Sequence, residues 1–204
     1  YFWKYGRKRL KYGSFDDTLK YDLKSAKHPS EREDYIELNK YIADSVDGII
    51  PVMYEYEVSY RGHKNLLGTI PMPINTHKIK YSDNILEKKI VIFHGLNRYG
   101  FKGTRHVEEA FKILKEKYPN ELEMIIDGHM PLETYLKFIK RTNIIIDQTN
   151  FHSLGVSGLY SMALGKVTLG GAEPEALESI GVASSPTINI KPNAKSIVEE
   201  IEKL

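Results

Sequence analysis

Short apolar runs alternate with helical patterns along the chain from about residue 85 onward. Each run is a nearly continuous stretch of Ile, Val and Leu, which suits a strand that is covered on both faces. The alternation of strands and helices predicts an α/β fold with a doubly wound, parallel, Rossmann-like sheet. The expected strands occupy residues 88–95, 122–128, 143–148, 166–171 and 185–190.

The segments between these strands carry apolar side chains at helical spacing. Residues 104–119 place such side chains at i, i+3, i+4 and i+7, and the pattern stops at Pro119. Residues 131–141 repeat the spacing behind Pro131, a residue that suits the first turn of a helix. Residues 193–204 do so behind Asn193, which is a favourable N-cap. We therefore expect helices on the sheet at all these places.

The first 75 residues differ from the rest, because they are polar and rich in tyrosine, and most of them show no periodic spacing of apolar positions. Residues 31–52 are the exception, and they predict a helix that ends before Gly48. The apolar positions that mark this helix are Tyr35, Leu38, Ile42 and Val46.

An extended connection is expected after this helix, because Pro71 and Pro73 interrupt a stretch without apolar period. We place a domain boundary near residue 76. Residues 1–75 then form a helical and irregular N-terminal segment, and residues 76–204 form the α/β domain. The chain begins with Tyr1 and not with Met, which suggests a fragment of a longer protein.

Composition narrows the range of partners. The 204 residues are 41% hydrophobic and 27% charged, with a formal net charge of +2, which is too small to favour nucleic acid as the main partner. There is no cysteine, and so no disulfide, thiolate metal site or thiol nucleophile. No apolar stretch approaches the roughly 18 residues that a membrane span needs. We expect a cytoplasmic protein.

A cluster of basic residues lies at the start of the chain, among tyrosines. Two interpretations of it stay open. The simpler one is a solvated basic face. The sharper one is peripheral attraction to an anionic membrane surface or an acidic acceptor, since each basic group near such a surface contributes on the order of 1 kcal/mol. The cluster consists of Lys4, Arg7, Lys8, Arg9 and Lys11.

The turn after the first strand combines glycines with two cations. Gly95, Gly100 and Gly103 let this loop bend, and Arg98 and Lys102 lie within a few residues of the helix expected near residue 104. Cations beside the free N–H groups of a helix start make an anion site. A flexible surface turn is the alternative interpretation.

The turn after the third strand points to the same kind of ligand. Asp147 and Gln148 end the strand, and a helix is expected to begin near Gly155 and Val156. The unpaired N–H groups of its first turn would face the crevice at the carboxyl edge of the sheet, where a glycine lets a phosphate oxygen come close. Close packing of helix on sheet is an equally good reason for Gly158.

The turn after the fourth strand carries Glu173 and Glu175 behind Gly170 and Gly171. Carboxylates at this edge would accept hydrogen bonds from sugar hydroxyls. They also complement the dipole of the helix that follows, and both roles can hold together.

Other kinds of site have weaker support. The histidines show no His-x-x-x-His pair, and no metal site is expected. The Gly-x-Ser-x-Gly elbow of many hydrolases and the P-loop motif are absent. Asp127 and His129 follow the second strand, where an acidic residue often binds the ribose in dinucleotide-binding folds. The Gly-x-Gly-x-x-Gly motif of those folds is missing, however.

Taken in order, the motifs FHGLNRYGFKGT, IIDQ, HSLGVSGLYSMALGK and GGAEPE resemble the C-terminal, nucleotide-sugar-binding half of the group 1 glycosyltransferases, which are retaining enzymes of the GT-B fold. The resemblance covers roughly residues 41–190. It implies a UDP- or GDP-linked sugar as substrate and no further cofactor, with residues 1–75 as the tail of the acceptor domain. It also implies that Arg98 and Lys102 hold the donor diphosphate.

The sequence departs from the family where the family has a Glu-x7-Glu motif. His152 and Tyr160 occupy the two glutamate positions, and Gly155 matches the glycine of the motif. The second glutamate usually binds the ribose of the donor. A Tyr hydroxyl forms a hydrogen bond of about 0.5–1.5 kcal/mol, against about 1.5–3 for a carboxylate, so roughly tenfold weaker or differently selected donors are expected. Core packing is the alternative role for Tyr160.

The leading hypothesis is therefore a hexosyltransferase fragment that binds a nucleotide-sugar donor for transfer to a polysaccharide or lipid-linked acceptor. The resemblance assigns no catalytic residue in this chain and implies that part of the active site lies outside it. Two alternatives remain: a non-catalytic GT-B-like assembly partner, which the loss of both glutamates favours, and a sugar-nucleotide epimerase, which shares the architecture.

Overall fold

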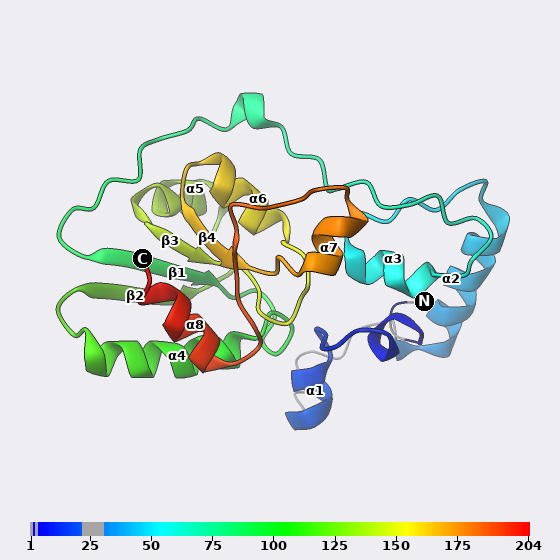
Figure 1. The fold of residues 1–204 in the computed structure, drawn as a ribbon, viewed down its shortest axis with the longest axis horizontal. Coiled ribbons are helices and arrows are strands. Elements are labelled where there is room, and N and C mark those ends of the chain that lie inside the picture. Colours follow the sequence, from blue (N-terminus) through cyan, green and yellow to red (C-terminus); the bar gives the residue numbers. More distant parts are fainter. Residues whose placement is uncertain (1, 3, 22–30) are drawn as a thin grey trace.

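The computed structural model describes residues 2, 4–21 and 31–204, and its centre is a parallel sheet of five strands in the order β2-β1-β3-β4-β5 (Figure 1). Each of the five expected strands is present, which confirms the α/β, Rossmann-like prediction. The strands are shorter than their apolar runs: β1 (Ile90–Gly95), β2 (Leu122–Asp127), β3 (Ile144–Ile146), β4 (Val167–Gly170) and β5 (Ile188–Asn189).

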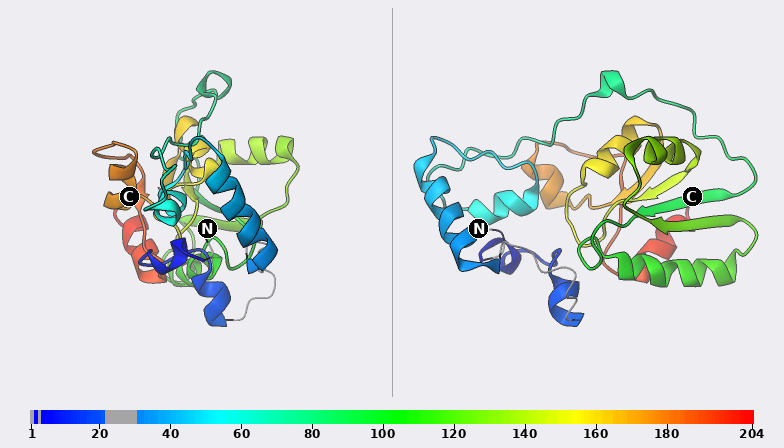
Figure 2. Two further views of the ribbon diagram at one scale, coloured as in Figure 1. Left: turned by 90° about the vertical axis from the view of Figure 1, so that its right-hand side faces the viewer. Right: turned by 180° about the vertical axis from the view of Figure 1, so that it is seen from behind.

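Helices cover both faces of the sheet, as Figures 1 and 2 show. Alternation along β1 explains the two layers, because Ile92 packs toward one face and Phe93 toward the other. The Ile92 face is covered by α4 (Thr104–Lys117) and α8 (Ala194–Ile201), whose buried residues share its cluster. The Phe93 face is covered by α5 (Leu132–Arg141) and α6 (Val156–Ala163). The short helix α7 (Pro174–Ser179) follows β4.

The N-terminal segment lies beside the carboxyl edge of the sheet and consists of short helices joined by irregular chain (Figure 1). A long connection with one short helical turn then crosses to the start of β1. The elements are η1 (Gly6–Lys8), α1 (Asp16–Tyr21), α2 (Glu33–Ser45), α3 (Tyr54–Tyr60) and η4 (Thr76–Lys78). The division of the chain near residue 76 stays a prediction.

The helix expected from residues 31–52 is present as α2, but its marked apolar stripe is exposed. Tyr35, Leu38, Ile42 and Val46 all lie open to solvent, whereas Ile36 and Ala43 are its buried side chains. The spacing was right for a helix, yet it gave no information about which side of that helix packs against the rest of the chain.

The strand order fixes where a ligand can bind. β1 lies between β2 and β3, so the connections after β1 and β3 leave the sheet toward opposite faces. In doubly wound sheets this divergence opens a crevice outside the carboxyl ends of the two strands. Any pocket here is therefore formed by the loops after Gly95 and Ile146 and by the start of α6.

His94 joins the elements beneath this crevice. Its Nδ1–H donates to the Ile146 carbonyl oxygen at 2.8 Å, and its Nε2 lies 3.0 Å from the Thr104 hydroxyl. The ring is fully buried, and burial lowers the pKa of His94 to about 4. The neutral ring thus connects β1, β3 and the start of α4.

The depressed pKa of His94 predicts a loss of stability in acid. An unfolded histidine has a pKa near 6.5, so the unfolded state takes up this proton first, and the free energy of unfolding falls as pH drops from about 6.5 to about 4. The contribution is about 3 kcal/mol. Urea unfolding at pH 7 and pH 4 should show a smaller pH dependence for His94→Asn than for the unchanged chain. The exposed His77→Asn serves as control, and equal pH dependence in all three proteins would contradict the assignment.

Candidate functional site

A cleft with a volume of about 460 Å³ opens at the carboxyl edge of the sheet, at the place that the strand order predicts. Its size is in the range of small-molecule sites. The ends of β1, β2 and β3, the side of α5 and the first turn of α6 line it. Of the site residues expected from the sequence, it contains Gly95, Lys102, Asp147, Val156 and Tyr160.

Lys102 reaches the cleft because the next residue is a glycine. Gly103 has a left-handed backbone with φ 76°, and a Cβ there would meet Thr149 Oγ1 at 1.9 Å. The loop can therefore lie directly on the chain after β3, where the Lys102 carbonyl accepts a hydrogen bond from Thr149 N at 2.9 Å. The Lys102 Nζ then lies 3.1 Å from Asp147 Oδ1.

Asp147 changes the predicted anion site. The helix does begin at Gly155, which is the N-cap of α6, and the Gly155 N–H donates to Asp147 Oδ2 at 2.7 Å. A carboxylate of the chain itself therefore lies at the helix start, where the sequence predicted a phosphate. Lys102 and Gly155 do face the same place, since one carboxylate contacts both.

Arg98 does not join Lys102 in the cleft. Its guanidinium stacks on the ring of Phe101, 4.3 Å from the ring centroid, and the side chain is exposed. The loop turns at Gly100, which has φ 83°, so two cations four residues apart point to different places. The prediction that both cations face one anion is not met by this geometry.

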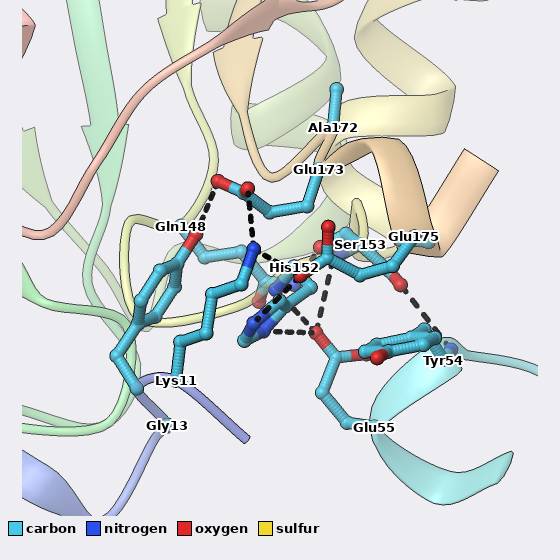
Figure 3. Close-up of polar contacts among 12 residues, drawn as sticks. Lys11, Gly13, Tyr54, Glu55, Gln148, His152, Ser153, Ala172, Glu173 and Glu175 are labelled. Atoms are coloured by element: carbon cyan, nitrogen blue, oxygen red, sulfur yellow. Dashed lines mark hydrogen bonds and ion pairs between the residues drawn. The ribbon is translucent and has the colours of Figure 1, made fainter. Parts of the chain in front are cut away.

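Gln148, His152, Glu173 and Glu175 also lie outside the cleft lining. They belong to a polar cluster between the N-terminal segment and the loops after β3 and β4 (Figure 3). Gln148 holds its own loop, because its Nε2 donates to the Ser153 carbonyl at 2.9 Å. The other three side chains meet residues of the N-terminal segment.

His152 is enclosed in this cluster. Its ring is 1% exposed and stacks on Tyr12, with 4.4 Å between ring centroids. Within the described residues, neither ring nitrogen has a hydrogen-bond partner, and Glu55 and Glu175 each lie 3.9 Å away. Burial lowers the pKa of His152 although the neighbouring glutamates act to raise it. The ring is therefore neutral at pH 7.

Glu55 holds the loop that carries His152. This fully buried carboxylate on α3 accepts hydrogen bonds from the backbone N–H groups of His152 and Ser153, the latter at 3.0 Å. The contact joins residues 97 positions apart and was not expected from the sequence. A glutamate inside a tyrosine-rich helix gave no signal of it.

Glu173 is the acceptor at the other end of the cluster. It accepts from the Tyr12 hydroxyl at 2.7 Å, from Asn189 Nδ2 at 3.2 Å and from Lys191 Nζ. Burial acts to raise the pKa of Glu173, but these donors outweigh it and lower that pKa below its usual value. Glu175 pairs with Lys11 at 2.6 Å. Both glutamates thus have partners within the chain.

Several cleft residues were set aside or missed in the sequence. Asp127, the last residue of β2, lines the cleft together with Gly128, His129 and Asn97. A Cβ at Gly128 would lie 1.5 Å from the Leu96 carbonyl oxygen, and His129 has φ 58°, which is rare for a residue with a side chain. An Asp-Gly-His sequence at a strand end is the signal that could have indicated them.

Solved structures provide the comparison for this architecture. No family model matches the sequence, and no curated protein matches it. Anabaena HepE in complex with UDP and glucose superposes with a TM-score of 0.60, at 11% identity over 86% of this chain and 58% of the other. Sucrose-phosphate synthase from Thermosynechococcus elongatus superposes with a TM-score of 0.58, at 15% identity over 92% of this chain and 56% of the other. TarM superposes with a TM-score of 0.57, at 13% identity over 82% of this chain and 39% of the other.

The chain has the fold of a GT-B half. At this identity the likeness concerns the fold alone, and it confirms the fold that the motifs implied. The chain spans less than two thirds of each of these structures, between 39% and 58%.

The basic cluster at the start of the chain makes several internal contacts. Arg9 donates to the carbonyl oxygens of Val58 and Arg61 at 2.8 and 3.0 Å. Lys4 pairs with Glu33 at 3.7 Å, and Lys11 with Glu175. A membrane contact through this cluster stays a prediction.

Across the described residues, the helices are too short or too polar to cross a membrane, and no group of acidic or histidine side chains is placed to hold a metal ion.

Removal of the Glu55 carboxylate should destabilise the chain. Glu55→Ala leaves two buried N–H groups, of His152 and Ser153, without an acceptor, which costs about 3 kcal/mol. Glu55→Gln keeps an acceptor oxygen and should cost less. Urea unfolding measures both against Glu37→Ala, an exposed site on α2 where a change within about 0.5 kcal/mol is expected. Equal effects of the Glu55→Ala and Glu37→Ala substitutions would show that the buried contact contributes nothing.

Proposed function

We propose that this chain contains the donor-binding domain of a glycosyltransferase, which binds a UDP- or GDP-linked sugar. One observation carries the proposal: Lys102 and the start of α6 meet in a cleft at the switch point of a GT-B sheet. A cation beside a helix start is suited to a diphosphate. The HepE structures, which share the fold, hold UDP with glucose or UDP-glucose.

The rest of the cleft suits a nucleoside. Its inner wall is apolar and comes from Phe93, Met130 and Ile145, against which the flat face of a base can pack. Tyr135 and Tyr160 line the same cleft, and we expect their hydroxyl groups to donate to ribose oxygens. Burial raises the pKa of Tyr135 to about 12.

Transfer of a hexosyl group with retention, to a polysaccharide or lipid-linked acceptor, is the full activity we propose. GT-B enzymes place the reaction between two halves, and this chain spans only 58% of HepE. We therefore expect the chain to bind the donor with little turnover. Partner groups that act on the acceptor would come from the other half.

A second candidate is a non-catalytic GT-B partner. His152 stands where the family has its first motif glutamate, and it is enclosed beneath Tyr12 instead of facing the cleft. Product analysis with nucleotide sugars and a glycan acceptor, on the protein with both halves present, separates the candidates. Glycosyl transfer would exclude the non-catalytic partner, and donor binding without any product would favour it.

Isothermal titration with UDP-glucose and a GDP-hexose tests the donor site. Lys102→Ala should weaken binding by about 10- to 100-fold, because it removes a charge-assisted hydrogen bond of about 1.5–3 kcal/mol. Lys112→Ala removes the same charge from the exposed side of α4 and should change nothing. The proposal fails if no nucleotide sugar gives heat with the unchanged chain.

The substitution Tyr160→Phe distinguishes a role of the Tyr160 hydroxyl in UDP binding from a role of its ring in core packing. The ring packs in the cluster of Phe93 and Ile145, and the substitution keeps it there. Loss of the hydroxyl alone should weaken UDP binding about 2- to 10-fold, in keeping with one neutral hydrogen bond, while the unfolding midpoint stays the same. Unchanged UDP affinity would leave core packing as the role of Tyr160.

A further inference from the structure

The buried carboxylate of Asp147 contacts Lys102 and the N–H of Gly155, the N-cap of α6, and we propose that it is an internal competitor for the donor diphosphate at these two groups. Phosphate oxygens reach the Gly155 N–H only by displacing the carboxylate, and they compete with it for the Lys102 ammonium. The inference rests on the proposed function and adds a property to it: the same site is tuned toward weak binding and ready release of nucleoside diphosphates.

The contacts of Asp147 are those of a bound anion. Its side chain is 0% exposed; Oδ1 lies 3.1 Å from Lys102 Nζ and Oδ2 lies 2.7 Å from Gly155 N. Each oxygen thus has one of the donors that a cation and a helix start offer to a phosphate. The Asp147 backbone is fixed as well, because its N–H donates to the Leu169 carbonyl at 2.9 Å.

Two glycines make room for this carboxylate. A Cβ built at Gly155 would lie 3.1 Å from Asp147 Oδ2, and one at Gly158 would lie 3.0 Å from the same oxygen and 2.7 Å from Leu154 Cδ2. Either contact is tighter than side chains normally tolerate. The glycines at the start of α6 therefore admit the chain's own carboxylate, and a diphosphate arriving at Lys102 meets it.

Charge balance in the cleft gives the direction of the effect. Lys102 is neutralised by Asp147, and Asp127 adds a second carboxylate to the lining. A diphosphate that enters must approach a buried negative charge in surroundings of low polarity, where repulsion is weakly screened. A neutral side chain of the same shape at position 147 should therefore bind the diphosphate more tightly.

Asp147→Asn is the direct test, with UDP and uridine as probes on the full chain. The amide oxygen can still accept from Gly155 N, but the amide nitrogen cannot accept from Lys102, which becomes available. UDP should bind about tenfold more tightly to the variant, while uridine, which has no phosphate, binds equally to both proteins. Asp83→Asn makes the same change of net charge at an exposed site and should leave UDP affinity as it was.

The possible outcomes separate this inference from the proposed function. If the unchanged chain binds UDP and Asp147→Asn binds it equally or more weakly, Asp147 positions Lys102 and the competitor role is overturned, whereas the donor site stands. If neither protein binds UDP at millimolar concentration, both fail. A tightening for UDP and uridine alike would also overturn the role, because it would not depend on phosphate.

A measurement on the unchanged chain keeps the test independent of the variant's folding. The Gly155 amide should give a changed NMR resonance when UDP replaces its carboxylate partner with a phosphate, and uridine should leave that resonance in place. A Gly155 resonance unmoved by saturating UDP would show that the carboxylate is not displaced, and would overturn the inference.

Discussion

The bond from the Gly155 N–H to the buried carboxylate of Asp147 is the contact around which the candidate site is organised. It ties the start of α6 to the end of β3, and the second carboxylate oxygen holds Lys102 from the loop after β1. Three segments that the strand order brings to one edge are thereby fixed relative to one another. An anion of the chain itself thereby neutralises the charge of Lys102 at the cleft.

Glu55, a second buried carboxylate, holds the same loop from its other side. Glu55 accepts from the backbone of His152 and Ser153, so the loop between β3 and α6 is held from the sheet side by Asp147 and from the N-terminal segment by Glu55. Both contacts connect a carboxylate to backbone N–H groups, which leaves few buried donors unpaired. The N-terminal segment is in this way part of the structure that positions α6.

Periodicity was enough for the order of strands and helices in the sheet, although it did not show which side of α2 is buried. It was not enough for the site. The sequence identified Lys102 and Gly155, which do meet, but it could not show that Asp147, eight positions before Gly155, takes the helix start. Arg98 failed because a turn at Gly100 sets the direction of the side chain. The role of Glu55 depends on a contact across 97 positions, which no local pattern encodes.

The buried carboxylates also bear on the side chains at positions 152 and 160. A glutamate at position 152 would be buried beside Glu55 and Glu175, whose oxygens lie 3.9 Å from the present ring, and like charges so close could not all ionise. A glutamate at position 160 would add a negative charge to a cleft that already contains Asp147 and Asp127. His152 and Tyr160 keep both places neutral. A glutamate at either position would therefore oppose a charge that the fold has already buried.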